Sequence, residues 1–189
     1  ASPALARVAV IGAIGTNKGS ELLLACAREA LKQGQPIQFR LFGYADNDAA
    51  LRRLANVHVT GEYKRADLPR LLAEHPCDAA LFLGIWPETY CYALTDAYSA
   101  GLYPIALNFG AVGERIAATQ VGTLLPAGSS PAEINAAIIE AIARSGDWPA
   151  RVEIGEDCPD ILADYYQLQP PDAVPELPPA RSARRRNRS

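Results

Sequence analysis

The stretch that decides the fold is LFLGIWPETYCYALTDAYSAGLYPIAL, residues 81–107. It opens with an apolar run over 81–85 that has no polar side chain, which is typical of a strand covered on both faces. A segment of helical spacing follows over 89–100, Gly101 ends it, and a second apolar run occupies 103–107. Strand, helix and strand in this order predict two parallel strands joined by a crossover helix.

The same alternation continues along most of the chain. Strands are predicted over 7–12, 36–43, 57–61, 79–85, 103–107 and 121–125, and helices over 19–33, 49–54, 67–75, 89–100, 111–118 and 130–144. Ser130 and Glu133 have the spacing of a capping box at the start of the last helix. We therefore predict an α/β fold, a Rossmann-like, doubly wound, parallel six-stranded sheet with helices on both faces.

Three regions are expected along the chain. Residues 1–146 form the Rossmann-like domain, residues 147–169 form a C-terminal helical segment that packs on it, and residues 170–189 are a Pro- and Arg-rich tail. The chain begins at Ala1 and contains no Met, so we expect a processed chain or a fragment of a longer protein. No apolar run reaches the roughly 18–20 residues that a membrane span requires.

The net charge and the spacing of the Cys residues argue against some classes of function. The net charge is −3, although the tail alone carries five Arg, so the body is clearly acidic and is not expected to bind nucleic acid. The basic tail is expected to be a solvated end, with a weak attraction to anionic lipid at the inner face of the membrane as the alternative. The four Cys are widely spaced, which favours a reducing, cytoplasmic compartment and no metal site.

A glycine-rich loop with one lysine follows the first strand. It reads GAIGTNKG over residues 12–19 and leads directly into the first helix. Glycines allow a ligand to approach the backbone, and helix N-termini present free N–H groups to anions. Lys18 would add a positive charge at that point. A tight strand-to-helix turn with one exposed lysine explains the same residues equally well.

Two carboxylates follow the fourth predicted strand, Glu88 in the loop and Asp96 about two turns into the next helix. A carboxylate accepts hydrogen bonds from two adjacent hydroxyl groups, so it suits the vicinal diol of a sugar or a ribose. The carboxyl ends of parallel strands share one edge of the sheet, where ligands of such folds bind. The alternative makes Glu88 a partner of the helix dipole and Asp96 a solvated surface residue.

Taken together, GAIGTNKG, PETYCYALTDAYSAGLYP and NFGAVGERI resemble, in order and spacing, the C-terminal half of GT-B-fold retaining glycosyltransferases of family 4. The resemblance covers about residues 7–145. It implies that Lys18 contacts the diphosphate of a nucleotide-sugar, that Glu88 contacts the transferred sugar, and that Asp96 contacts the ribose. The backbone N–H groups of Thr89 and Tyr90, at the expected helix start, would hold sugar and phosphate.

The resemblance also implies a wider binding site. Gly15 and Thr16 would join the phosphate loop, and Gly43 and Tyr63 would lie near the nucleobase. The family places Arg where this chain has Ala13, and Glu where it has Asp96, so one diphosphate contact is missing and one carboxylate is shorter by a methylene.

The implied activity is retaining transfer of a hexose from a UDP- or GDP-sugar to a bacterial polysaccharide or glycolipid, without cofactor or metal. The acceptor would bind an N-terminal domain missing here, so the chain alone should bind the sugar donor but transfer poorly. A non-catalytic GT-B-like nucleotide-binding or scaffold module is the alternative, motivated by Ala13. A nicotinamide-dependent oxidoreductase is disfavoured because G-x-G-x-x-G is absent.

Overall fold

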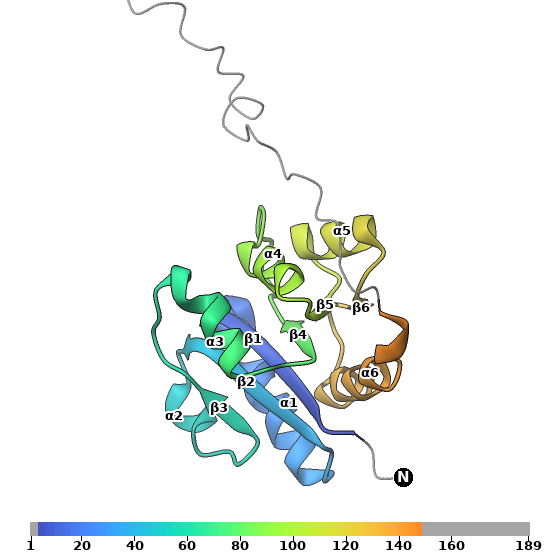
Figure 1. Cartoon of the computed structure of the whole chain (residues 1–189). Coiled ribbons are helices and arrows are strands. Elements are labelled where there is room, and N and C mark those ends of the chain that lie inside the picture. Colours follow the sequence, from blue (N-terminus) through green and yellow to red (C-terminus); the bar gives the residue numbers. More distant parts are fainter. Residues whose placement is uncertain (1–3, 149–189) are drawn as a thin grey trace, which may run out of the picture. The chain divides into compact units, whose positions relative to one another are not determined.

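Six parallel strands form the centre of the domain (Figure 1). The computed structural model describes residues 4–148. The strands are β1 (Ala6–Ile14), β2 (Ile37–Ala45), β3 (Val57–Val59), β4 (Ala79–Phe82), β5 (Tyr103–Leu107) and β6 (Thr123–Leu125). Their spatial order is β3-β2-β1-β4-β5-β6, and every neighbouring pair is parallel. The predicted doubly wound sheet is confirmed.

Helices cover both faces of this sheet. They are α1 (Ser20–Lys32), α2 (Asp48–Leu51), α3 (Leu68–Glu74), α4 (Tyr92–Ser99), α5 (Gly110–Thr119) and α6 (Pro131–Ala143), with short 3₁₀ turns at Thr16–Lys18, Arg65–Asp67 and Ser145–Asp147. Alternate strand residues point to opposite faces. Val8 and Val10 pack in the cluster that contains α1 and α6, whereas Ala9 and Ile11 pack in the cluster that contains α3 and α4.

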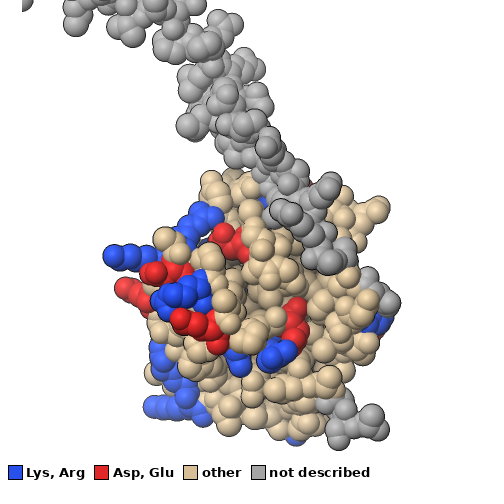
Figure 2. All heavy atoms as spheres, viewed as in Figure 1, with Lys and Arg blue, Asp and Glu red and all other residues tan. Residues whose placement is uncertain are grey.

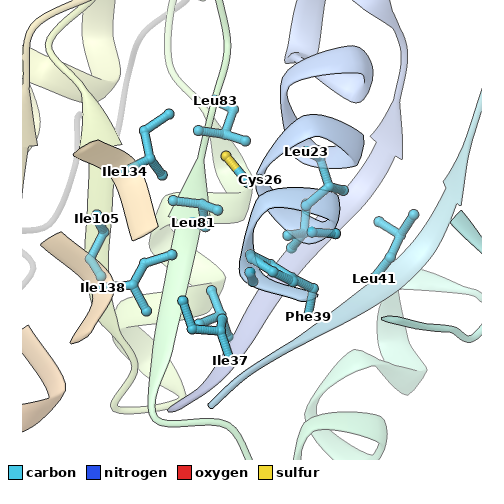
Figure 3. Close-up of a cluster of buried hydrophobic side chains, with 14 of the residues drawn as sticks. Leu23, Cys26, Ile37, Phe39, Leu41, Leu81, Leu83, Ile105, Ile134 and Ile138 are labelled. Carbon is cyan, nitrogen blue, oxygen red and sulfur yellow. The ribbon is translucent and has the colours of Figure 1, made fainter. Parts of the chain in front are cut away.

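The larger cluster joins α1 and α6 to buried residues of β1, β2, β3, β4 and β5. Figure 3 shows Leu23 and Cys26 of α1 and Ile138 of α6 converging on the side chains of β2 and β4. The buried amide of Asn135 ties the two helices together, because it donates to the Cys26 carbonyl at 2.9 Å and to Gln35 at 3.0 Å. Ser130 and Glu133 form the predicted capping box at the start of α6. This cluster forms the part of the core that lies on one face of the sheet.

The order of the strands places a crevice beside β1 and β4. From β1 the chain proceeds through α1 and α2 toward β3, and from β4 it proceeds through α4 and α5 toward β6 on the other face. Crossovers of a single hand must lie on opposite faces when the strand order runs in opposite directions. The loops after β1 and β4 therefore diverge at the carboxyl edge, which is where ligands bind in such sheets.

The start of α4 differs from the expected position. The helix begins at Tyr92 rather than at Thr89, and residues 83–91 form a loop. The cause is Cys91, whose φ of 65° is left-handed and cannot belong to a right-handed helix. Asp96 consequently lies about one turn into α4, and Thr89 and Tyr90 lie in the loop before it.

Several of the sequence predictions concern the C-terminal part of the chain. Trp148 stacks on Tyr103 with ring centroids 4.4 Å apart, so the chain still packs on the domain where the description ends. The predicted C-terminal segment beyond residue 148 and the basic tail over 170–189 lie outside the described residues. Within residues 4–148, none of the helices has the length and apolar character needed to cross a membrane.

Candidate functional site

A cleft of about 800 Å³ opens at the carboxyl edge of the sheet. Its walls come from the ends of β1 and β2, the loop after β3, the loop after β4 and the first turns of α4. On the face of the molecule shown in Figure 2, acidic and basic side chains are interspersed. The charged residues that line the cleft are likewise of both signs: Lys18, Arg65, Glu62, Glu88 and Asp96.

The floor of the cleft depends on two glycines in neighbouring strands. Gly12 of β1 is paired in register with Gly43 of β2, and both line the cleft. Gly43 has a φ of 130°, and a Cβ at this position would overlap the carbonyl oxygen of Gly12. The Gly43 N–H donates to Thr60 Oγ1 at 3.0 Å, which anchors the end of β2. Only glycine fits at position 43 without moving the backbone.

Lys18 is brought to the cleft by a loop that packs against the loop after β4. Gly19 follows it with a φ of 82°, and any Cβ there would overlap the Leu83 carbonyl oxygen. The Ile85 N–H donates to the Asn17 carbonyl at 3.0 Å, which joins the two loops directly. As a result, Lys18 Nζ lies 3.5 Å from Glu88 Oε1, although half of the Lys18 side chain remains exposed.

Asp96 has a cationic partner of its own. Arg65, in the loop after β3, donates to Asp96 Oδ1 at 3.2 Å, and its guanidinium lies 4.7 Å from the ring centroid of Tyr92. Tyr63 lines the same end of the cleft, and burial together with the negative charge of Asp96 raises the pKa of its phenol. Tyr63 is therefore a hydrogen-bond donor at neutral pH and not an anion.

Cys91, in the loop before α4, is poorly suited to act as a nucleophile because its thiol is held in the neutral form. Burial and then the nearby charge of Glu88 raise the pKa of Cys91 to about 11. A thiol needs its thiolate form to attack an electrophile, and that form is scarce at neutral pH when the pKa is this high. Within residues 4–148, His, Cys, Asp and Glu side chains form no group of three suited to hold a metal ion.

Most of the residues predicted for the site meet in this cleft. Its lining includes Lys18, Gly43, Tyr63, Glu88, Thr89, Tyr90 and Asp96. Gly15 and Thr16 are not part of the lining. The Gly15 carbonyl accepts the Lys18 N–H at 2.9 Å, and Thr16 Oγ1 donates to Asp46 at 3.0 Å, so these two residues shape the loop that presents Lys18.

Several residues that line the cleft were not among the predicted site residues, including Tyr44, Glu62, Arg65 and Tyr92. Tyr44 and Glu62 are chain neighbours of the predicted Gly43 and Tyr63, so a wider reading of the same loops could have found them. Tyr92 falls inside the helix predicted over 89–100, where nothing in the sequence distinguishes it from its neighbours. No spacing rule relates Arg65 to Asp96, because their contact joins the loop after β3 to α4 and exists only in the folded chain.

Comparison with known proteins gives a consistent result. Residues 5–157 match the model of the family described as glycosyl transferases group 1. No curated protein matches the sequence significantly. Among solved structures, Anabaena HepE in complex with UDP and glucose is similar at 22% identity and a TM-score of 0.60, covering 75% of this chain and 40% of HepE.

Two further structures show the same fold. The C-terminal domain of a group 1 glycosyl transferase, LpcC of Francisella tularensis, has 18% identity and a TM-score of 0.59, with 87% of each chain covered. Sucrose-phosphate synthase of Thermosynechococcus elongatus has 20% identity and a TM-score of 0.60, covering 75% of this chain and 37% of the synthase. The chain thus spans about two fifths of HepE and of the synthase. With its family model matched over most of its length, the chain belongs to the group 1 glycosyl transferases.

Proposed function

We propose that the cleft binds a nucleotide-sugar and that the chain is the donor-binding part of a retaining, family 4-like hexosyltransferase. The observation that carries the proposal is the arrangement of Lys18 and Glu88, 3.5 Å apart, in one cleft with Asp96. A cation for phosphate and two carboxylates for hydroxyl groups are the side chains that a sugar joined to a ribose by a diphosphate requires.

Each end of the ligand has a partner in this proposal. Glu88 accepts hydrogen bonds from the transferred hexose, and Lys18 stabilises the diphosphate as the bond to the anomeric carbon breaks. Asp96 accepts from the ribose hydroxyls through the oxygen that Arg65 leaves open, and the base lies near Gly43 and Tyr63. The acceptor oxygen forms the new bond to the anomeric carbon, and its proton leaves with the departing diphosphate.

For the choice of nucleotide and for the acceptor, the proposal relies on the structurally similar proteins. HepE was crystallised with UDP and glucose, which supports a UDP-sugar for this chain ahead of a GDP-sugar. The chain spans two fifths of that neighbour, which supports a further domain that binds the acceptor. We propose a bacterial polysaccharide or glycolipid as acceptor and a cytoplasmic location, with the tail over 170–189 as a weak contact to the membrane surface.

Calorimetry tests this proposal. UDP-glucose, UDP-N-acetylglucosamine and GDP-mannose are titrated into the wild type, into Glu88→Ala and into Lys18→Met. Glu140→Ala serves as the control, because Glu140 is an exposed residue of α6 on the other face of the sheet. We expect one nucleotide-sugar to bind the wild type and the control alike and both cleft variants more weakly. Binding of none of them, or binding that ignores Glu88 and Lys18, overturns the proposal.

A non-catalytic nucleotide-binding module is the second candidate. The cleft lining has three carboxylates against two cations, and Ala13 adds no charge at the phosphate loop, so a diphosphate meets fewer cations than the family resemblance implies. Transfer activity of a longer protein that contains this chain separates the candidates. Activity that disappears with Glu88→Gln supports the transferase, and a protein that binds a nucleotide but never transfers supports the module.

A further inference from the structure

The segment Glu88–Cys91 forms one wall of the cleft and belongs to neither a strand nor a helix. Most of its carbonyl groups are nevertheless held by hydrogen bonds from α5, and the Cys91 carbonyl also accepts from the Leu94 N–H of α4 at 3.1 Å. The Ala111 N–H donates to the Glu88 carbonyl at 3.4 Å, and Arg115 Nη1 donates to the carbonyls of Tyr90 at 3.0 Å and of Cys91 at 3.1 Å. Three of the four carbonyls in the segment are therefore fixed from α5.

Arg115 does more than hold the backbone. Its Nη2 donates to Thr95 Oγ1 of α4 at 2.9 Å, and its guanidinium lies 4.3 Å from the ring centroid of Tyr90. One half-buried side chain of α5 thus joins the loop to the helix that carries Asp96. Planar guanidinium groups are suited to such a task, because their N–H groups point in fixed directions and their faces stack on aromatic rings.

The conformation that Arg115 holds is a costly one. Cys91 has a φ of 65°, in the left-handed region that residues with a Cβ seldom adopt because it is sterically strained. The Cys91 carbonyl is one of the two that accept from Arg115 Nη1. Without these bonds we expect the segment to leave this conformation easily, and with it the position of the N–H groups of Thr89 and Tyr90.

The contacts continue along the cleft. The ring of Tyr90 lies 4.8 Å from that of Tyr92, and Tyr92 in turn lies under Arg65, which pairs with Asp96. Arg115, Tyr90, Tyr92 and Arg65 therefore form one row of contacting side chains that runs from α5 to the carboxylate proposed for the ribose. The loop end of this row is fixed by hydrogen bonds, whereas the Arg65 end is held by an exposed ion pair.

We propose that Arg115 is a positioning residue, which orders the Glu88–Cys91 segment for the hexose part of the nucleotide-sugar. This inference rests on the proposed function. Its distinctive consequence is selectivity, because UDP lacks the hexose that Glu88 binds. Free UDP keeps its proposed contacts with Lys18 and Asp96, so only its phosphate contact with the Thr89 and Tyr90 N–H groups depends on the segment. Loss of Arg115 should therefore weaken the binding of a nucleotide-sugar much more than that of the free nucleotide.

The test compares Arg115→Met with the wild type for UDP-glucose and for UDP by calorimetry. Arg144→Met is the matched control, because Arg144 pairs on the surface with Glu140 of α6. We expect Arg115→Met to lower the affinity for UDP-glucose about tenfold, equivalent to about 1.4 kcal/mol, and that for UDP less than threefold. Amide hydrogen exchange of a peptide covering 88–91 should accelerate in the same variant. Equal loss of both ligands, or no loss, overturns the inference.

A milder variant covers the case in which Arg115→Met does not fold. Thr95→Val removes one acceptor of Arg115 and the 3.4 Å hydrogen bond from Thr95 to the Tyr90 hydroxyl, and leaves the arginine in place, so we expect a two- to threefold loss for UDP-glucose and none for UDP. Arg115→Lys keeps the charge but not the planar set of N–H groups, and should fall between Arg115→Met and the wild type. If the wild type binds neither ligand, the proposed function fails first; if it binds both and Thr95→Val is neutral, only Arg115 loses its role.

Discussion

Lys18 Nζ lies 3.5 Å from Glu88 Oε1, and this contact joins the loop after β1 to the loop after β4 across the point where the strand order diverges. Both side chains line the cleft, and both remain partly exposed. Exposed ion pairs contribute little to stability, typically 0–1 kcal/mol. The pair is thus better suited to receive a ligand than to hold the fold together.

Lys18→Met should weaken the binding of UDP about tenfold, because a hydrogen bond to a charged group contributes roughly 1.5 kcal/mol at an exposed site. Isothermal titration calorimetry measures this effect directly. The control is Lys32→Met, at the exposed end of α1, where the lysine pairs with Glu29. A loss of the same size in Lys32→Met would mean that general charge, and not the position of Lys18, attracts the ligand.

Arg65→Met should leave the melting temperature almost unchanged but reduce the affinity for UDP a few-fold at low salt. The guanidinium is largely exposed, so its pair with Asp96 adds little stability, but its loss leaves the cleft lining more negative toward a diphosphate. The difference from the wild type should shrink at high ionic strength, where exposed charges are screened. Arg70→Met, which breaks an exposed pair with Glu74, is the control. A salt-independent loss would contradict this electrostatic explanation.

Asp78→Asn should lower the free energy of unfolding by about 1 kcal/mol and leave nucleotide binding intact. Asp78 precedes β4 and accepts from the backbone and side chain of Arg7 in β1, at 2.7–3.0 Å, on the edge of the sheet away from the cleft. Urea denaturation measures the first effect and calorimetry the second. A loss of binding without a loss of stability would be the opposite of what the position predicts.

The same pair gives a pH dependence with a defined sign. Burial opposes ionisation of Asp78, but the hydrogen bonds from Arg7 outweigh it and hold the pKa of the carboxyl below its usual value. The contribution is complete above the pKa of an unfolded Asp, about 4, and is lost as the pH falls through the lower value of the folded chain. The stability difference between wild type and Asp78→Asn should therefore shrink on acidification, and a difference that grows would contradict this.

Gly43→Ala should destabilise the domain by about 2 kcal/mol more than Gly12→Ala. Both glycines have a positive φ and face each other in register, so the cost of the backbone conformation is similar. Only the Cβ at position 43 meets an atom, the Gly12 carbonyl oxygen, whereas nothing lies within 4 Å of a Cβ at position 12. Equal midpoints in urea for the two variants would show that the approach of the two strands is less tight than described.

The fold could be predicted from local patterns because each strand and helix carries its own periodicity. The apolar run at 79–85 and the helical spacing of α1 identify elements one at a time, and strict alternation leaves a parallel sheet as the natural arrangement. The point at which the strand order changes direction, between β1 and β4, is a property of the whole sheet. This arrangement of the strands brings Lys18 and Glu88 together. Their meeting was predicted from the family resemblance and not from the periodicity.

The parts that sequence reasoning missed depend on tertiary contacts. Cys91 is not a residue that usually adopts a left-handed conformation, so the delayed start of α4 had no local signal. The contacts of Arg65 and of Arg115 join elements that are remote in sequence. Both arginines are visible in the sequence, but their partners became apparent only in the folded chain, where Arg65 meets α4 and Arg115 of α5 meets the loop after β4.

The location of the ligand is best measured by the backbone amide NMR shifts of the chain as UDP-glucose is added. We predict that the largest changes fall on Lys18, Gly43, Tyr63, Thr89 and Tyr90, and that they are much reduced in Glu88→Gln. Residues of α6, on the other face, should not move. A second groove between α3 and α4 is lined by residues such as Leu72, Ala73 and Ala100. Saturable shifts confined to that groove, or the absence of any shift at millimolar ligand, would contradict a nucleotide-sugar site at Lys18 and Glu88.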